Sequence, residues 1–315
     1  MSAPASSHER PIQAILLMNL AVFIFTAMDG VIKSISHVFP TGELIFARNL
    51  FAFLPLLGYM LVVERRISLR THQPWGHVWR GAMGVSAMFC FFLSYKLLPL
   101  SDAIALGLAG PIFLTILSVP LLREQVGWRR WSAVTIGFVG VLVMTRPGSG
   151  IFNPAALVPL LAAVFYALAM ISIRKLAQTE KPTTIVFYFT LFATFASFVT
   201  YPLGGIDAEL AWRWPADTEQ VLLLMLIGIM GGCAQIALTI AFRRGSVSLV
   251  APFDYMALVY GFLIGFFLFA EVPDAYLIGG GLIVVASGIY IIHRETVLAR
   301  QRRRQALVPS LPVTQ

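Results

Sequence analysis

Ten long apolar segments, joined by short polar connections, dominate this sequence of 315 residues. A helix needs about 20 apolar residues, and no fewer than about 17, to cross a bilayer. The segments reach that length and lack the period-two alternation of membrane barrels. They lie near residues 12–34, 41–63, 77–97, 102–122, 129–145, 154–174, 183–203, 218–241, 247–269 and 275–293. The sequence therefore predicts an all-α integral membrane protein with ten transmembrane helices.

The composition favours the same class of protein. Hydrophobic residues make up 58% of the chain and charged residues only 12%, which is far too apolar for a soluble protein of this length. The net charge of +8 does not indicate nucleic acid, because Lys and Arg lie almost wholly between the apolar segments or in a basic tail. Cys90 and Cys233 lie inside apolar segments without any metal-ligand spacing. We predict a lipid bilayer and a small molecule as partners, with no nucleic acid, metal or other cofactor.

The placement of Lys and Arg predicts the orientation of the chain in the membrane. If the N-terminus is cytoplasmic, eighteen of these residues fall in inside segments, Arg80 among them, and four in outside segments. Positive residues accumulate on the cytoplasmic side of membrane proteins. Both termini are therefore predicted to be inside. The longest outside loop, residues 204–220, agrees because it holds four acidic residues and one basic residue.

The two halves of the chain share a pattern that predicts an internal repeat. Residues 94–124 and 241–271 both run from an aromatic and a cationic residue through a short turn, a serine and an apolar segment to a terminal Glu. Identical residues recur at an offset of 147 positions, among them Gly81 and Gly228, and the helix ends coincide as well. Because five helices per half is an odd number, the second half enters the membrane from the opposite side. The repeat is therefore predicted to be inverted, as in many secondary transporters.

The pattern divides the chain into five parts. They are an N-terminal cytoplasmic tail (1–11), a first five-helix repeat (12–146), a Gly/Pro-rich linker (147–153), a second five-helix repeat (154–293) and a basic cytoplasmic tail (294–315).

These features together resemble the EamA family of the drug/metabolite transporter superfamily. The resemblance rests on the five-plus-five plan, the repeated Ser and Glu, and the glycine-containing last helices WSAVTIGFVGVLVM and YLIGGGLIVVASGIYII. It covers about residues 12–293 and implies a multi-pass transporter of the bacterial inner membrane. It further implies a pore lined by helices one to four and six to nine, with the fifth and tenth at the periphery. The pattern departs at Ala133, where the second half has Gly280, and this implies a different packing of the fifth helix.

Ionisable groups inside a bilayer are costly, so the few within the apolar segments are candidate site residues. Counting about 1.5 Å per residue places Asp29 and Arg48 roughly 7 to 10 Å below the outer surface. Together they could form a structural ion pair or bind the two ends of a zwitterion. A third interpretation pairs Asp29 with Lys33, one helical turn away.

A second group of polar residues is predicted near the inner surface. Asn19, Gln235 and Asp254 lie at a depth of about 10 Å by the same count, with Tyr255 beside Asp254. A carboxylate, two amides and a phenol at one level could bind an amine or a polar ring through hydrogen bonds. The alternative is that Asn19 and Gln235 only link helices.

Glu124 and Glu271, which close their helices at the membrane surface, are interpreted as structural anchors. The glycines of the third and eighth segments are interpreted as close helix contacts, because small residues let helices approach. All five histidines lie in loops or at helix ends, and no Walker, HExxH or GxSxG motif occurs. These observations disfavour an enzyme, while a channel stays open as an alternative.

The predicted function is secondary transport of a small polar organic metabolite. One hypothesis is export of an amino acid or a related compound, and the other is import of a larger metabolite such as a nucleoside-like cofactor or a vitamin. A coupling proton would need a carboxylate that titrates near neutral pH, for which Asp29, Asp254 and Glu271 are the candidates. The sequence leaves the cargo, the direction, the coupling ion and the oligomeric state open.

Overall fold

The computed structural model describes residues 11–65, 69–122, 128–145, 153–176, 179–205, 211–244 and 251–306. Within these residues the chain is helical and contains no strand. The helices before residue 150 are α1 (Pro11–Ile35), α2 (Thr41–Tyr59), α3 (Pro74–Leu97), α4 (Leu100–Gly107), α5 (Gly110–Leu122) and α6 (Trp128–Thr145). Those after it are α7 (Leu157–Leu176), α8 (Pro182–Phe198), α9 (Thr218–Arg244), α11 (Met256–Phe269) and α12 (Ala275–Ala306).

Short turns of other helix types extend four of these helices. They are a π turn, η1 (Met60–Glu64), and three 3-10 turns, η2 (Pro154–Ala156), η3 (Tyr201–Gly205) and η4 (Ala251–Tyr255).

The fourth predicted segment is broken in the structure into α4 and α5. The break falls between Gly107 and Gly110, both poor helix formers, and Pro111 has no N–H to donate into the preceding turn. The hydropathy pattern cannot show such a break, because every residue around it is apolar or small.

The last helix is longer than predicted. The sequence places the end of the tenth apolar segment at residue 293, but α12 continues to Ala306. The intervening residues, RETVLARQRRRQA, are mostly good helix formers and contain neither Gly nor Pro. The basic tail therefore begins as a continuation of the helix, while residues 307–315 lie outside the described part of the chain.

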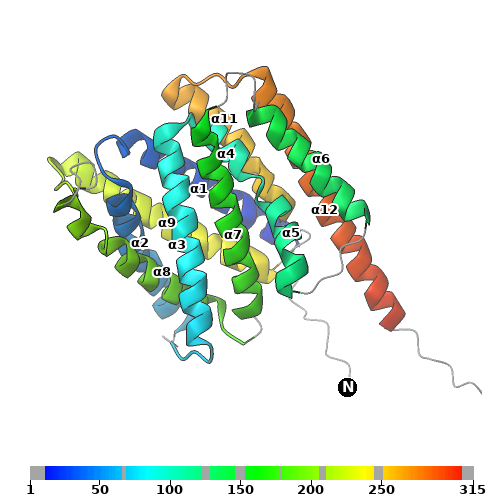
Figure 1. Cartoon of the computed structure of the whole chain (residues 1–315). Coiled ribbons are helices and arrows are strands. Elements are labelled where there is room, and N and C mark those ends of the chain that lie inside the picture. The colour runs from blue at the N-terminus through cyan, green and yellow to red at the C-terminus, as the bar shows by residue number, and fades with distance from the viewer. Residues whose placement is uncertain are drawn as a thin grey trace, which may run out of the picture.

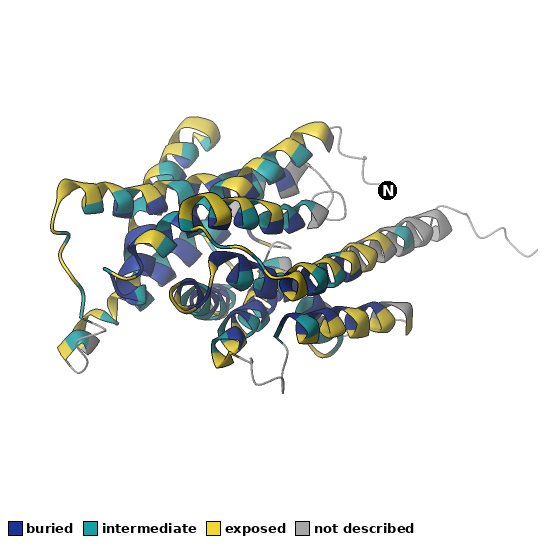
Figure 2. Ribbon diagram, turned by 90° about the horizontal axis from the view of Figure 1, so that it is seen from above, coloured by how far each residue is buried: buried dark blue, intermediate teal, exposed yellow. Residues whose placement is uncertain are grey.

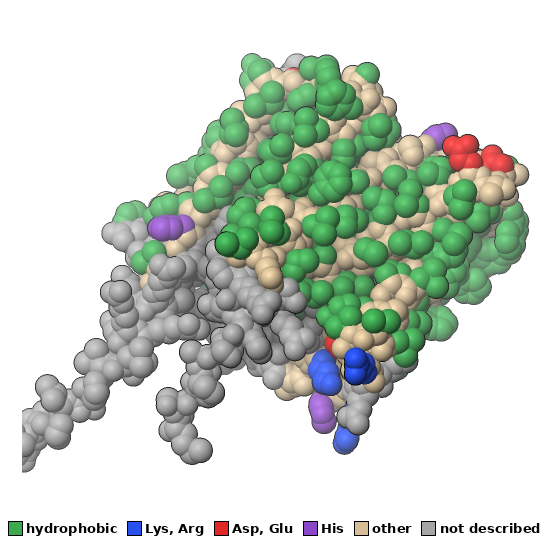
Figure 3. Space-filling view, turned by 180° about the vertical axis from the view of Figure 1, so that it is seen from behind, with side chains coloured by type: hydrophobic (Ala, Val, Ile, Leu, Met, Phe, Trp, Pro, Cys, Tyr) green, Lys and Arg blue, Asp and Glu red, His purple; other side chains and the backbone are tan. Residues whose placement is uncertain are grey.

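The outward faces of the helices are apolar, as expected for a membrane protein. Leu16, Leu20 and Phe23 of α1 and Leu263 and Phe267 of α11 are all exposed. Figure 2 shows exposed residues along the outer sides of the helices and buried residues between them. In Figure 3 hydrophobic side chains cover most of the visible face, with acidic side chains gathered near one end and basic ones near the other.

In the part of the chain that the structure describes, four helices are long and apolar enough to cross a membrane: Ile12–Ile35, Thr41–Glu64, Pro154–Ile173 and Thr218–Leu238. Five further apolar helices among the described residues are shorter. The fold is thus all-α and multi-pass.

Helices from the two halves of the chain pack against one another rather than forming separate bundles. The most extensive contacts join α6 with α12, α1 with α9, α3 with α7 and α2 with α9. Figure 1 shows α6 and α12 side by side along one edge of the molecule, with the other helices grouped beside them. The α6–α12 contact uses small residues, since Gly140 and Gly280 face each other and the Ser287 hydroxyl donates to the carbonyl oxygen of Ala133.

Candidate functional site

The structure brings Asp29 of α1 and Arg48 of α2 together in the middle of the helix bundle. Arg48 is only 5% exposed, and the two side chains attract each other electrostatically. The Tyr95 hydroxyl hydrogen-bonds to Asp29. Arg48 Nη1 donates to Asn49 Oδ1 at 2.9 Å, and the Asn49 amide in turn donates to the carbonyl oxygen of Ile45. Asn49 therefore fixes the guanidinium, although the structure describes no direct ion pair between Arg48 and Asp29.

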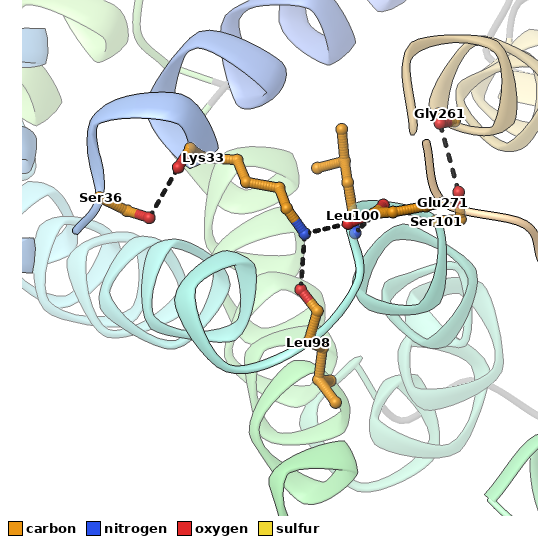
Figure 4. Close-up of polar contacts among 7 residues, drawn as sticks. All are labelled: Lys33, Ser36, Leu98, Leu100, Ser101, Gly261 and Glu271. Carbon is orange, nitrogen blue, oxygen red and sulfur yellow. Dashed lines mark hydrogen bonds and ion pairs between the residues drawn. The ribbon is translucent and has the colours of Figure 1, made fainter. Parts of the chain in front are cut away.

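Lys33 does not pair with Asp29 in the structure, so that interpretation of the sequence is wrong. Lys33 Nζ instead forms an ion pair with Glu271 at 2.5 Å and donates to the carbonyl oxygen of Leu98 at 2.9 Å (Figure 4). Glu271 also accepts the backbone N–H of Leu100 at 2.8 Å. This network joins the end of α1, the start of α4 and the end of α11.

The backbone at the end of α11 turns so that Glu271 lies within this network. Ala270 has a φ of 53°, in the left-handed region, and the Glu271 N–H donates to the carbonyl oxygen of Gly265. This is the hydrogen-bond pattern that ends many helices, usually with glycine at the left-handed position. Ser101 lies beside it, with its hydroxyl 3.4 Å from the carbonyl oxygen of Gly261. The first-half counterpart, Glu124, lies outside the described residues.

Arg80 belongs to the interior of the bundle, although it is counted above among the positive residues on the cytoplasmic side. It is 6% exposed and lies over the ring of Phe189, 3.6 Å from the ring centroid. Within the described part of the chain, its Nε and Nη1 atoms have no hydrogen-bond partner, and neither has Arg48 Nε. Arg80 repels Arg48 electrostatically and is attracted to Tyr166 of α7.

Tyr166 connects Arg80 to Asp254. It interacts electrostatically with both groups and is 39% exposed. The exposed fraction shows that the Tyr166 side chain is not packed on all sides. No sequence pattern singles out Tyr166, because it lies in the apolar run AVFYALAM.

The resulting cluster joins residues from five structural elements. Each interacts electrostatically with the next, in the order Tyr95, Asp29, Arg48, Arg80, Tyr166 and Asp254. Three of these six are sequence-predicted site residues, and the tertiary structure adds Tyr95, Arg80 and Tyr166.

The other predicted site residues are placed differently. The Asn19 amide donates to the carbonyl oxygen of Ile15 in its own helix at 3.1 Å. Gln235 of α9 is half-buried, and its side chain is not without a partner. Tyr255 is 6% exposed, and its hydroxyl fills the space next to Gly288 of α12, where a Cβ would collide with it. The side chain of Tyr255 therefore faces α12, while the neighbouring Asp254 interacts electrostatically with Tyr166.

The glycines of α3 and α9 make two matching sets of helix contacts. In α3, Gly81 lies against Phe192 and Gly84 against Phe189, both from α8. In α9, the repeat-related Gly228 lies against Phe51 of α2, and Gly231 against Arg48. Phe192 and Phe51, like Phe189 and Arg48, are 141 positions apart in the sequence.

A polar network also joins the α2–α3 connection to the α7–α8 connection. Glu180 Oε1 accepts the N–H of His72 at 2.6 Å and the hydroxyl of Thr71 at 2.9 Å. Burial alone would raise the pKa of Glu180, but these hydrogen bonds outweigh it and hold the pKa below its ordinary value. The Tyr188 hydroxyl donates to the carbonyl oxygen of Leu69 at 2.7 Å.

Within the described residues, no group of three or more His, Cys, Asp or Glu side chains could hold a metal ion.

A family model and several known relatives match this chain over most of its length. The model of the EamA-like transporter family matches residues 12–146 and 153–293. The chain is 32% identical over 305 residues to a riboflavin transporter of Vibrio cholerae, covering 96% of this chain and 100% of the relative. It is 32% identical to the pseudopaline exporter of Pseudomonas aeruginosa, covering 87% of this chain and 94% of that protein.

Two further similarities extend the comparison. The chain is 30% identical to an S-adenosylmethionine uptake transporter of Rickettsia prowazekii, covering 80% of this chain and 83% of that protein. A solved structure titled "Crystal structure of protein" superposes with a TM-score of 0.62 at 21% identity, covering 91% of this chain and 97% of that chain. That likeness shows a shared fold. With a family model that matches most of its length, the chain belongs to the EamA-like transporter family.

Proposed function

We propose that this protein is a secondary transporter that moves a small polar organic metabolite across the bacterial inner membrane by alternating access. The observation that carries the proposal is the polar cluster from Tyr95 to Asp254 inside a bundle whose outer faces are apolar. Ionisable groups so placed are costly and mark substrate pathways in membrane proteins.

The membrane plan in this proposal is ten spans in two inverted repeats, 12–146 and 154–293, with both termini inside. Two observations support it. The family model matches the chain in two separate stretches. The contacts of Gly81 and Gly84 with α8 are repeated by those of Gly228 and Gly231 with α2. In such an arrangement each half supplies equivalent helices of opposite orientation, which can exchange conformations.

Two of the polar networks described above could close the transporter at either end of the bundle. In the proposed orientation, the Lys33–Glu271 pair lies at the outer end and the Glu180 network at the inner end. Each joins elements that are distant in the sequence, so each would have to open when the central site is exposed to its side.

Export of an amino acid or a related compound is the first candidate for the cargo and direction. Import of a larger metabolite, such as a vitamin or a nucleoside-like cofactor, is the second candidate. The names of the relatives support both directions, because they include a pseudopaline exporter, a riboflavin transporter and an S-adenosylmethionine uptake transporter.

A metabolite comparison of cells with and without the gene, measured inside the cells and in the medium, tests the proposal. We expect at least one polar metabolite to change in opposite directions in the two compartments. Asp254→Asn should abolish this difference with the protein still present in the membrane, while Glu219→Gln, which removes an exposed carboxylate, should preserve it. No gene-dependent metabolite, together with no flux of candidate metabolites in proteoliposomes, would overturn the transport function.

A further inference from the structure

Helices α4 and α11 come from opposite halves of the chain and pack closely along two glycines of α11. A Cβ at Gly261 would lie 2.7 Å from Ile104 Cδ1, and a Cβ at Gly265 would lie 2.7 Å from Ser101 Oγ. The Ser101 hydroxyl also lies 3.4 Å from the carbonyl oxygen of Gly261 (Figure 4). Small residues let two helices approach in this way. This contact, the α4–α11 seam, therefore leaves no space even for a methyl group at either glycine.

The ion pair of Lys33 and Glu271 fastens one end of this seam. Both side chains are partly buried, with 15% and 17% exposed. Lys33 Nζ also binds the carbonyl oxygen of Leu98, and the Glu271 carboxylate accepts the N–H of Leu100 (Figure 4). These two backbone groups flank Pro99, which has no N–H of its own to donate. The ion pair therefore ties α1 and α11 to the first residue of α4.

The backbone before Glu271 is in a conformation that disfavours a permanent link. Ala270 has a φ of 53°, in the left-handed region, which costs free energy for a residue with a Cβ. At a helix end that never changes, glycine would adopt this conformation at lower cost. The strain at Ala270 offsets part of the stabilisation that the ion pair provides. Such a balance suits a contact that must both form and break, because the two states then differ little in free energy.

We propose that the α4–α11 seam and the Lys33–Glu271 ion pair form the outer gate of the transporter, and that the gate is closed in this structure. The inference rests on the transport function and the orientation proposed above, and it names the contact that moves. On opening, the ion pair breaks and α4 separates from α11 along Gly261 and Gly265. Because the seam joins the two halves of the chain, this separation is a movement of one half against the other, as alternating access requires.

The accessibility of a cysteine in the seam tests the gate without any cargo. The probe is Ile104→Cys, and the matched control is Ile185→Cys, at a buried isoleucine near the start of α8. Both are made in the full-length protein with Cys90→Ala and Cys233→Ala, which remove the native thiols. The purified proteins are labelled in detergent with a fluorescent maleimide, and the labelling rates are compared.

Changes at the ion pair should alter labelling at position 104 alone. Glu271→Gln breaks the ion pair and should speed labelling there several-fold, because the seam opens more often. Ala270→Gly should slow it, since glycine relieves the strain of the closed gate. Neither change should affect labelling at position 185, which lies outside the seam.

A disulfide across the seam tests whether transport needs it to open. A Cβ at Gly261 would lie 3.6 Å from Ile104 Cβ. That separation is within the range of about 3.5–4.5 Å between the Cβ atoms of a disulfide. Ile104→Cys also removes the atoms with which a larger residue at position 261 would collide. We expect oxidation of the Ile104→Cys/Gly261→Cys variant to abolish the flux of the gene-dependent metabolite in proteoliposomes, and a reductant to restore it. The variant without native thiols should not respond to the oxidant.

Several results would overturn the inference. Labelling at position 104 that Glu271→Gln leaves unchanged, or that Ala270→Gly speeds, would remove the ion pair from the gate. Faster labelling at both positions would show a general loosening of the fold. A disulfide that forms but leaves the flux unchanged would show that the seam does not open during transport, and one that never forms would show that α4 and α11 do not make this contact.

Failure of the transport function is separable from these results. The absence of flux in the wild type would remove that function, whatever the labelling shows. If only the reduced double-cysteine variant lacks flux, the labelling rates decide for or against the gate.

Discussion

Gly231 of α9 lies directly against the guanidinium of Arg48, so that a Cβ at position 231 would stand 2.8 Å from Arg48 Nε. The glycine therefore does more than allow two helices to approach. It provides the space that the cation at the centre of the polar cluster occupies, and this suggests a first prediction.

Gly231→Ala should displace Arg48 from Asp29 and strongly reduce transport. Overpacking of this kind also costs about 1–3 kcal/mol of stability. Gly279→Ala is the matched control, because no atom lies within 4 Å of a Cβ at Gly279 in α12. That control should keep transport and be as stable as the wild type or more so, since alanine favours the helix. Transport rates in proteoliposomes and unfolding temperatures that do not differ between the two variants would contradict the prediction.

Asp29 and Arg48 should depend on each other for folding. Asp29→Asn leaves the buried guanidinium without its counter-charge, and Arg48→Gln leaves the carboxylate without its own. We expect each single change to reduce the yield of folded protein, measured by size-exclusion chromatography, and the double change to restore part of it. Loss of transport at normal yield in the single variants would instead assign both residues to cargo binding.

Glu271 should stabilise the protein through two separable contacts. Glu271→Gln removes the ion pair with Lys33 but keeps an oxygen that can accept the N–H of Leu100, whereas Glu271→Ala removes both contacts. Unfolding temperatures should therefore fall in the order wild type, Gln variant, Ala variant. A double-mutant cycle with Lys33→Met should give a coupling free energy of about 1 kcal/mol, the upper end of the range for ion pairs near the surface, because both side chains are partly buried. A coupling energy near zero would show that the ion pair does not stabilise the folded protein.

The Glu180 network should make stability depend on pH in the acidic range. Because the folded-state pKa of Glu180 lies below its ordinary value of 4.5, the carboxylate stabilises the folded protein fully above that value. The stabilisation is lost as the pH falls through the folded-state pKa. The difference in unfolding temperature between wild type and Glu180→Gln should thus be largest near neutral pH and shrink on acidification. A difference that is constant with pH, or that the exposed Glu219→Gln variant shows equally, would contradict this assignment.

Much of the candidate site could be predicted from the sequence, because charged residues stand out against apolar segments. Asp29, Arg48 and Asp254 are predicted in this way, and the structure includes all three in one cluster. Arg80 counts among the cytoplasmic positive residues in the sequence, since it lies near the start of its helix and an arginine there usually marks the cytoplasmic side. Tyr166 gave no signal, because a tyrosine in an apolar helix is common whether it faces lipid or the interior.

The sequence by itself determined the class of the protein and the existence of the helices. Apolar runs of sufficient length leave a chain no alternative to helices in lipid, where each backbone hydrogen bond must be made within the segment. Only the tertiary structure decided which groups meet: Lys33 with Glu271 rather than Asp29, and Arg80 with Phe189 and Tyr166. The physical reason is that contacts between helices depend on their rotation and crossing, which small residues such as Gly84 and Gly231 set jointly across helices far apart in the chain.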